Sequence, residues 1–129
     1  RTKSRGLGDV YKRQVFALEE AAKEKDVNYH IGVVQSKDSF YGQHDPNSMP
    51  VSHELNQKWD AWVKGGVLCS EMEASTLFVV GSYRKLRTGA LLVVYGDQNR
   101  QEALGKDEYL ESVNIATNII LEASLKIPY

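Results

Sequence analysis

The seven residues from Gly89 to Tyr95 read Gly-Ala-Leu-Leu-Val-Val-Tyr, and this run constrains the fold more than any other part of the chain. An uninterrupted apolar run of this length predicts a strand that is buried on both faces. A β-branched run over Tyr29–Gln35 and a short apolar run over Val67–Cys69 predict two further strands. Because a sheet that is buried on both faces needs helices to cover it, the sequence predicts an α/β fold.

Four helices are expected from apolar residues that recur at helical spacing. They cover residues 15–26, Ser52–Lys64, Glu71 to about Lys85, and a long stretch from Asp107 onward. Since strands alternate with helices, we expect a layered α/β/α domain with a mixed sheet. The segment Ser36–Pro50 is polar and contains Gly and Pro, so it is predicted to be a long loop of the kind that is often functional.

Two side-chain patterns refine these helices. In Ser52–Lys64 the apolar stripe consists of Leu55, Trp59 and Trp62, and Gly65-Gly66 ends the helix. In the helix after Glu71, the residues Leu77, Phe78 and Val80 are expected to point inward.

Composition narrows the class of protein. The chain has 129 residues, of which 42% are hydrophobic and 26% charged, as in ordinary globular domains. No apolar run approaches the roughly 18 residues of a membrane helix, and the charged N-terminus does not resemble a signal peptide, so we expect a cytoplasmic protein. The single cysteine, Cys69, lies in an apolar run and is expected to be a small buried hydrophobe.

Several classes of site are not indicated. The three histidines, His30, His44 and His53, lack the spacing of a metal site, so no metal is expected. The chain has neither a Gly-rich dinucleotide fingerprint nor a P-loop, so we expect no such cofactor.

Residues 1–14 differ from the rest of the chain, because five basic side chains face one acidic one without a helical or strand period. The run Asp9–Gln14 back-translates as GAT GTG TAT AAG AGA CAG, which resembles a transposon end used in sequencing libraries. We therefore expect residues 1–14 to be a non-native, adaptor-derived segment and 15–129 to be the domain. Without that segment the formal net charge changes from −1 to −5, which gives no support to a nucleic-acid surface.

The segment Ser70-Glu71-Met72-Glu73-Ala74-Ser75 follows the apolar run Gly66–Cys69. Taken alone, Ser70-x-x-Glu73 is a capping box, in which Ser70 bonds an amide of the first turn and Glu73 bonds back to the amide of Ser70. Together with the small residues Ala74 and Ser75, however, Glu-Met-Glu resembles the ribose-binding segment of the nucleoside phosphorylase family. The resemblance runs from about Val15 to near the C-terminus and covers the C-terminal half of such an enzyme.

This resemblance implies roles for three residues. Glu73 accepts hydrogen bonds from the ribose 2′ and 3′ hydroxyls, Met72 packs against the sugar, and Glu71 supports the same site. The chemistry is suitable, because a carboxylate offers only acceptors and a thioether offers an adaptable apolar surface.

The segment Phe40-Tyr41-Gly42-Gln43 resembles the base site of the pyrimidine-specific members of this family. There Phe40 stacks on the base, and the carboxamide of Gln43, which has both an acceptor and donors, pairs with the ring N–H and a carbonyl of uracil. The alternative is that the aromatic residues belong to a core and Gln43 to a solvated loop. Many uridine-specific members have an arginine two residues after the glutamine, and here that position is Asp45, so another donor is needed.

The turn after Tyr95 contains Asp97, Gln98 and Arg100. Purine-specific members of the family have an aspartate in this turn, to which Asp97 could correspond, whereas Gln98 or Arg100 could supply the donor that Asp45 cannot. A plain surface turn built on Gly96-Asp97 is the alternative.

The resemblance implies the cleavage of uridine by inorganic phosphate to uracil and ribose 1-phosphate, with Glu73 and Gln43 as the principal residues. It also implies nucleoside and phosphate as substrates, a hexamer, and no cofactor. The phosphate site belongs to the N-terminal half of the family's chain, so we expect this chain to lack phosphorolysis. A purine nucleoside phosphorylase or nucleosidase is one alternative, and a non-catalytic α/β fragment that binds nucleosides is another.

Overall fold

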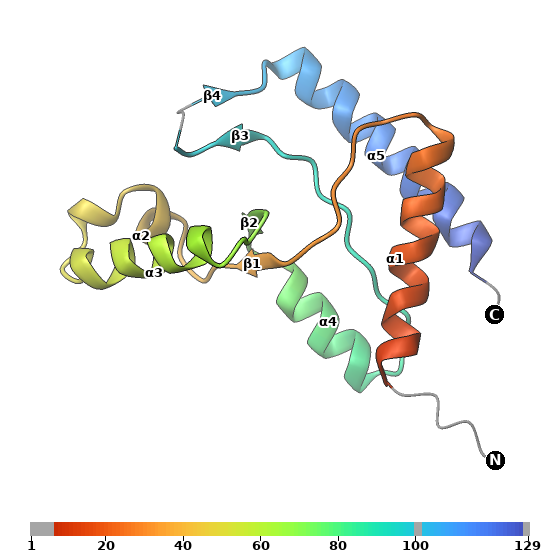
Figure 1. Cartoon of the computed structure of the whole chain (residues 1–129), viewed down its shortest axis with the longest axis horizontal. Helices are drawn as coiled ribbons and strands as arrows, with labels where there is room; N and C mark the ends of the chain where they lie inside the picture. The colour runs from red at the N-terminus through yellow and green to blue at the C-terminus, as the bar shows by residue number, and fades with distance from the viewer. Residues whose placement is uncertain (1–6, 100–101, 128–129) are drawn as a thin grey trace. The chain divides into compact units, whose positions relative to one another are not determined.

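A computed structural model describes residues 7–99 and 102–127, with side chains from residue 12 onward (Figure 1). The chain divides into two compact units. The βαβ unit is His30–Thr76, and the helix-pair unit contains the residues up to Tyr29 and those from Leu77 onward. Helix α4 (Ala74–Tyr83) begins in the first unit and continues into the second.

In the βαβ unit two short parallel strands pair with each other. They are β1 (Val34–Ser36) and β2 (Cys69–Glu71), with Gln35 opposite Ser70. Backbone bonds at the two ends continue this ladder, from Leu68 N to Val33 O at 2.9 Å and from Lys37 N to Glu71 O at 2.8 Å. Since parallel strands need a long crossover, the connection contains α2 (Phe40–His44), the 3-10 turn η1 (Pro46–Ser48) and α3 (Ser52–Lys64).

The helix-pair unit is built on α1 (Leu7–Glu24) and α5 (Lys106–Lys126), which lie side by side in Figure 1. Its core consists mainly of small residues, which allow the two backbones to approach closely: Ala17, Ala21, Ala22, Ile119 and Ala123. A short antiparallel pair, β3 (Gly96–Asp97) and β4 (Glu102–Ala103), precedes α5.

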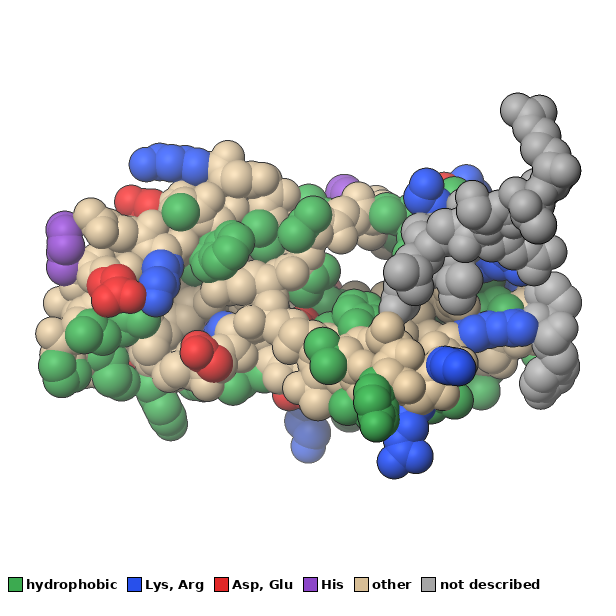
Figure 2. All heavy atoms as spheres, turned by 90° about the horizontal axis from the view of Figure 1, so that it is seen from below, with side chains coloured by type: hydrophobic (Ala, Val, Ile, Leu, Met, Phe, Trp, Pro, Cys, Tyr) green, Lys and Arg blue, Asp and Glu red, His purple; other side chains and the backbone are tan. Residues whose placement is uncertain are grey.

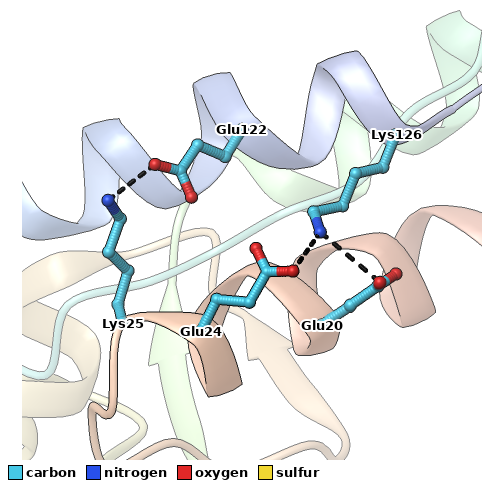
Figure 3. A network of polar contacts seen from close by, with 5 residues as sticks. All are labelled: Glu20, Glu24, Lys25, Glu122 and Lys126. Carbon is cyan, nitrogen blue, oxygen red and sulfur yellow. Dashed lines mark hydrogen bonds and ion pairs between the residues drawn. The ribbon is translucent and has the colours of Figure 1, made fainter.

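Ion pairs flank this apolar contact (Figure 3). Lys126 lies 2.6 Å from Glu24 and 3.4 Å from Glu20, and Lys25 lies 2.6 Å from Glu122. Lys126, the later residue on α5, pairs with the earlier residues Glu20 and Glu24, whereas Glu122 pairs with Lys25. The two helices therefore run in opposite directions. All these charges remain partly solvated, so they contribute less than the buried apolar contact does.

Three helices end in the same way. After α1, α3 and α4 the chain makes the two hydrogen bonds of a Schellman motif, with an apolar residue just beyond. The residue in the left-handed conformation is Asp26 after α1, Gly66 after α3 and Lys85 after α4. Only Gly66 is the residue type that favours this conformation, so sequence inspection detects the end of α3 more readily than the other two.

The predicted helices are confirmed, and the chain has the mixed α/β character that was expected, with α3 covering the predicted Ser52–Lys64. The strands are shifted from their expected positions. Strand β1 ends one residue after the predicted Tyr29–Gln35, and β2 ends two residues after the predicted Val67–Cys69. Only the residues that pair between the two strands form the ladder. In the same way α4 begins at Ala74 instead of Glu71, since Glu71 belongs to the strand.

The prediction of a strand over Gly89–Tyr95 is wrong for this structure. The segment has no assigned strand, and Leu92, Val94 and Tyr95 are exposed. A strand forms only where a neighbour accepts and donates its backbone hydrogen bonds. Among the described residues Leu104 N donates to Tyr95 O at 2.8 Å, but no strand is paired along the rest of the run, so its composition alone is insufficient.

Two further expectations are corrected. The segment Ser36–Pro50 is not a plain loop, because it contains α2 and η1. The side chains of Leu77, Phe78 and Val80 do not point into a core, since they are 46%, 37% and 51% exposed. Figure 2 shows other apolar side chains at the surface as well. An amphipathic pattern can select a face only where a neighbouring element covers it.

Residues 7–14, whose sequence shows no helical or strand period, form the start of α1, and the side chain of Gln14 is buried. The adaptor origin of residues 1–14 stays a prediction, and residues 1–6 lie outside the described part of the chain. Among the described helices none is long and apolar enough to cross a membrane.

Candidate functional site

The residues of interest in the βαβ unit gather where β1 and β2 end. Lys37 follows β1 directly and leads into α2, which carries Phe40 and Gln43, while Met72 and Glu73 follow β2. Ligands of open α/β sheets bind outside the carboxyl ends of the strands, because the loops there converge. The structure therefore brings together five of the predicted site residues in one unit: Phe40, Gln43, Glu71, Met72 and Glu73.

Helix α2 presents its side chains because Ser39 begins it. The Ser39 side chain accepts a hydrogen bond from Gly42 N at 3.0 Å, as an N-terminal cap does. Gly42 is buried, and a Cβ there would lie 2.9 Å from Ser39 Oγ, so a larger residue would displace the cap. Ser39 and Gly42 thus fix the turn that carries Phe40 and Gln43.

Phe40 belongs to an aromatic cluster on α2. Its ring centroid lies 5.4 Å from that of Tyr41 at 85° and 4.3 Å from that of His44 at 33°. The Phe40 side chain is 50% exposed, so a planar ligand has access to this cluster. Partial burial and then the charge of Lys37 lower the pKa of His44, which favours the neutral imidazole.

Ser70 joins the two loops at the strand ends. Its hydroxyl oxygen accepts a hydrogen bond from Gln43 Nε2 at 2.8 Å and another from Lys37 Nζ at 3.0 Å. Gln43 is therefore tied to β2 by a side-chain hydrogen bond. The two donors converge on one oxygen atom, so the amide and the ammonium group lie close to each other.

Glu71 organises the start of α4. One carboxylate oxygen, Oε2, accepts hydrogen bonds from Glu73 N at 2.6 Å and Ala74 N at 2.5 Å, while Oε1 accepts one from the Ser36 hydroxyl. The Ser36 oxygen in turn accepts one from Ser75 N at 3.0 Å. Helices begin with unsatisfied amides, and here Glu71 and Ser36 satisfy three of them.

The pKa of Glu71 reflects these contacts. Burial acts to raise the pKa, but hydrogen bonds from Ser36, Ala74 and Glu73 and the charge of Lys37 together lower it below the ordinary carboxyl value. The side chain is therefore ionised at neutral pH and acts as an acceptor in all three bonds.

The capping box Ser70-x-x-Glu73, which is the structural alternative for this segment, does not form with the predicted partners. Ser70 bonds Gln43 and Lys37 instead of an amide of α4, and Glu73 accepts a bond from the amide of Met72 at 3.2 Å instead of that of Ser70. Glu71 is the acidic residue that caps the helix. Because β2 extends to Glu71, the helix starts later than the capping-box pattern assumes.

Met72 and Glu73 lie exposed beside this cap, and Met72 is 40% exposed. Glu73 Oε2 accepts the Met72 amide, and no described donor bonds its other carboxylate oxygen. An exposed carboxylate next to an exposed thioether can receive a polar ligand that also has an apolar face.

The remaining candidates lie elsewhere. Asp97 and Gln98 belong to the helix-pair unit, where Asp97 is in β3 and its Oδ1 accepts a bond from Asn99 N at 2.9 Å, as in a surface turn. Arg100 lies outside the described residues. Asp45 is at the junction of α2 and η1, and its backbone carbonyl accepts a bond from Ser48 Oγ.

Cys69 is half-buried, and burial followed by the charge of Glu71 raises the pKa of its thiol, so it has no feature of an activated nucleophile. Within the described part of the chain, no three His, Cys, Asp or Glu side chains are arranged to hold a metal ion.

Sequence inspection missed Ser36 and Lys37 and gave Ser70 a different role. A signal was available, since all three lie at the ends of predicted strands, where parallel strands place functional residues. What could not be read was the register of β1 with β2, which sets Gln35 opposite Ser70 and so places Ser36 and Lys37 beside them.

A polar cluster at the carboxyl ends of parallel strands, beside an exposed aromatic ring, is an arrangement typical of ligand sites in α/β proteins, and it makes this end of the βαβ unit the candidate site. The sequence profile of the Phosphorylase superfamily matches residues 12–126, so the chain belongs to that superfamily.

Relatives with assigned names include two uridine phosphorylases. That of Treponema pallidum is 48% identical over 107 residues, which make up 83% of this chain and 42% of the relative. That of Escherichia coli is 32% identical over 114 residues, or 86% and 45% of the two chains. A purine nucleoside phosphorylase of the DeoD type from a Jannaschia species is 32% identical over 108 residues, or 84% and 42%. The chain thus spans less than half the length of these relatives.

Proposed function

We propose that the site at the ends of β1 and β2 is the nucleoside site of a uridine phosphorylase. The observation that carries the proposal is the Ser70 junction, where Gln43 Nε2 is bonded at 2.8 Å and so is tied to the strand that leads into Met72 and Glu73. The 48% identity to the Treponema pallidum uridine phosphorylase supports this choice of substrate.

Each residue has a role that its chemistry permits. Glu73 accepts hydrogen bonds from two neighbouring ribose hydroxyls, and Met72 packs on the sugar. Phe40 stacks on the base, and Gln43 offers its carboxamide to the uracil edge. Glu71 has both oxygens engaged, so its part is to hold the backbone of the ribose-binding segment instead of touching the sugar.

The reaction in this proposal is phosphorolysis. A phosphate oxygen forms a bond to the anomeric carbon as the bond to the base breaks, and the bonding electron pair leaves with the base. Catalysis then depends on positioning and electrostatics, so no cofactor is needed beyond phosphate as a co-substrate. The residues of this chain account for the nucleoside side of the reaction, and the proposed phosphate donors belong to the part of the relatives that the chain does not span.

The proposal also covers the fold and the assembly of the protein. In a protein of the relatives' length we propose a layered α/β/α domain with a mixed sheet, of which residues 15–129 are the C-terminal part. A hexamer located in the cytoplasm is the assembly that the family resemblance favours. Exposed apolar residues on α4 and along Gly89–Tyr95 support an arrangement in which other elements cover them.

The test is calorimetry of the 129-residue chain with uridine, together with an assay for uracil release in the presence of phosphate. We expect uridine to bind, and Glu73→Ala and Gln43→Ala each to weaken binding about tenfold, which corresponds to roughly 1.4 kcal/mol. We expect the chain on its own to release no uracil.

Matched controls are Glu54→Ala and Gln57→Ala, which remove the same functional groups from exposed positions on α3 in the same unit. The controls are expected to bind uridine as the unaltered chain does. Equal binding by the site variants and the controls would contradict the assignment, and so would the absence of any uridine binding.

A purine nucleoside is the second candidate substrate. It is favoured by Asp97, because an aspartate can protonate a purine ring nitrogen, and by the identity to the DeoD-type relative. Titration of inosine beside uridine separates the two: tighter binding of inosine, abolished by Asp97→Asn, would support the purine assignment.

A further inference from the structure

Among the described residues of the site, Lys37 is a cation to which the family resemblance gives no role. It is the first residue after β1, its Nζ donates to Ser70 Oγ at 3.0 Å, and the same Nζ lies 5.8 Å from the centroid of the Phe40 ring. A cation at this distance from an aromatic ring remains within range of a favourable interaction. Lys37 thus lies between the ring that would stack on a base and the residue that holds Gln43.

The hydrogen-bonding capacity of this cluster is only partly used. An ammonium group has three N–H donors, and among the described residues Lys37 uses one of them, on Ser70. The Ser70 oxygen accepts two bonds, which occupy its two lone pairs, so its own O–H must point to another acceptor. The described residues provide no such acceptor. The cluster therefore offers several N–H and O–H donors around one point.

Donors of this kind select a particular ligand chemistry. These donors favour a ligand with several hydrogen-bond acceptors along one edge. The positive charge of Lys37 favours a ligand that is an anion or that gains negative charge during the reaction. The adjacent Phe40 ring favours a flat ligand. A pyrimidine base with ring carbonyls has both properties, and it gains negative charge as its bond to ribose breaks.

We propose that Lys37 is a specificity residue that donates a hydrogen bond to a ring carbonyl oxygen of the base and stabilises the base as an anion. The inference rests on the function proposed above. As the glycosidic C–N bond breaks, its electron pair passes to the ring nitrogen and delocalises onto the carbonyl oxygen, where the ammonium group lies. Lys37 keeps its proton throughout, and the departing base takes a proton from solvent.

This role also accounts for Asp45. A base carbonyl needs a donor, and Asp45 offers only a carboxylate, while its backbone serves the junction of α2 and η1. Lys37 reaches the same cluster from β1 instead of from α2. The donor is thus supplied from the end of β1, and the pairing of β1 with β2 brings it to Ser70.

A purely structural role is the competing explanation, because Lys37 also ties the end of β1 to β2 through Ser70. The two roles are separated by Lys37→Gln, which retains an N–H donor for Ser70 but removes the charge. A structural tie tolerates this change, whereas stabilisation of an anion does not.

The experiment is calorimetry of the 129-residue chain with two probes, uracil and 5-fluorouracil, at about pH 8. Fluorine makes the ring N–H more acidic, so a larger share of 5-fluorouracil is anionic. We expect the unaltered chain to prefer 5-fluorouracil, and Lys37→Gln to weaken its binding about tenfold, an effect of about 1.4 kcal/mol, while uracil is affected less.

Lys37→Arg, which keeps the charge, should restore the preference, and Lys64→Gln, at an exposed position on α3, should leave it unchanged. Circular dichroism of each variant establishes that it is folded, and if Lys37→Gln does not fold, the comparison of Lys37→Arg with Lys37→Met replaces it. A folded uncharged variant that keeps the full preference for 5-fluorouracil overturns the role of Lys37 but leaves the proposed function intact. Failure of the unaltered chain to bind either base or uridine overturns both.

Discussion

The two units of this chain are held together by different forces. In the helix-pair unit, Ile119 and alanines of α1 and α5 are buried against each other, and charged pairs flank them. In the βαβ unit the buried residues are small, namely Gly42 and Ala74, and the specific contacts are hydrogen bonds through Ser36, Ser70 and Glu71. One unit depends on apolar area, and the other depends on polar groups that are fixed by strand pairing.

This difference shows where function can be located. Polar groups that are tied to one another can be aimed at a ligand, whereas an apolar helix contact serves mainly stability. The same difference predicts that the two units respond to different perturbations, and three experiments examine it.

The largest effect is expected from Ile119→Ala. Ile119 is 3% exposed in the core of the helix-pair unit, and its removal leaves a cavity, so the free energy of unfolding should fall by about 3 kcal/mol. Urea unfolding followed by circular dichroism measures the change. The control is Ile120→Ala on the same helix, where the side chain is 46% exposed and the expected loss is about 1 kcal/mol or less. Equal losses would show that the α1–α5 contact does not carry the stability of its unit.

A smaller effect is expected from Glu71→Gln, in the βαβ unit. The amide places an NH₂ group where one carboxylate oxygen accepted, either against the Ser36 hydroxyl or against the amides of Glu73 and Ala74. The expected loss of unfolding free energy is about 1–2 kcal/mol. Glu73→Gln is the control, since Glu73 is exposed and accepts a single bond at 3.2 Å.

The pH dependence of the Glu71 variant sharpens this result. The pKa of Glu71 is lowered in the folded chain, so its carboxylate stabilises the fold above the ordinary carboxyl pKa. That contribution is lost as the pH falls through the lowered value. The difference between the unaltered chain and Glu71→Gln should therefore shrink between about pH 5 and pH 3. A difference that stays constant over this range would mean that the charge of Glu71 is not what holds α4.

The smallest effect is expected from Lys126→Met. The Lys126 ammonium pairs with Glu20 and Glu24, and these contacts raise its pKa, but the group is solvated and the pairs are screened by salt. We expect a small decrease in the unfolding midpoint at low salt that disappears at about 1 M salt. A decrease that persists at high salt would mean that the packing of the Lys126 methylene groups, instead of its charge, joins the helices.

Part of this structure is accessible from the sequence because its causes are local. The spacing of Leu55, Trp59 and Trp62 and the Gly65-Gly66 pair define α3 within its own segment. Glu-Met-Glu after an apolar run likewise marks the end of β2 within its own segment. Gly89–Tyr95 shows the limit, because an apolar run specifies that a segment can be buried but not that a neighbour is present to bury it.

The sequence by itself determined where the long helices lie, that the chain is α/β, and which short motifs are the candidates for a nucleoside site, because periodicity and side-chain type are local properties of each segment. The tertiary structure decided the rest. The parallel pairing of β1 with β2 joined Ser36 to Glu71 and fixed both Gln43 and Lys37 on Ser70. The physical reason is that these contacts join residues about 30 apart in sequence, and only the register of two strands sets which of them meet.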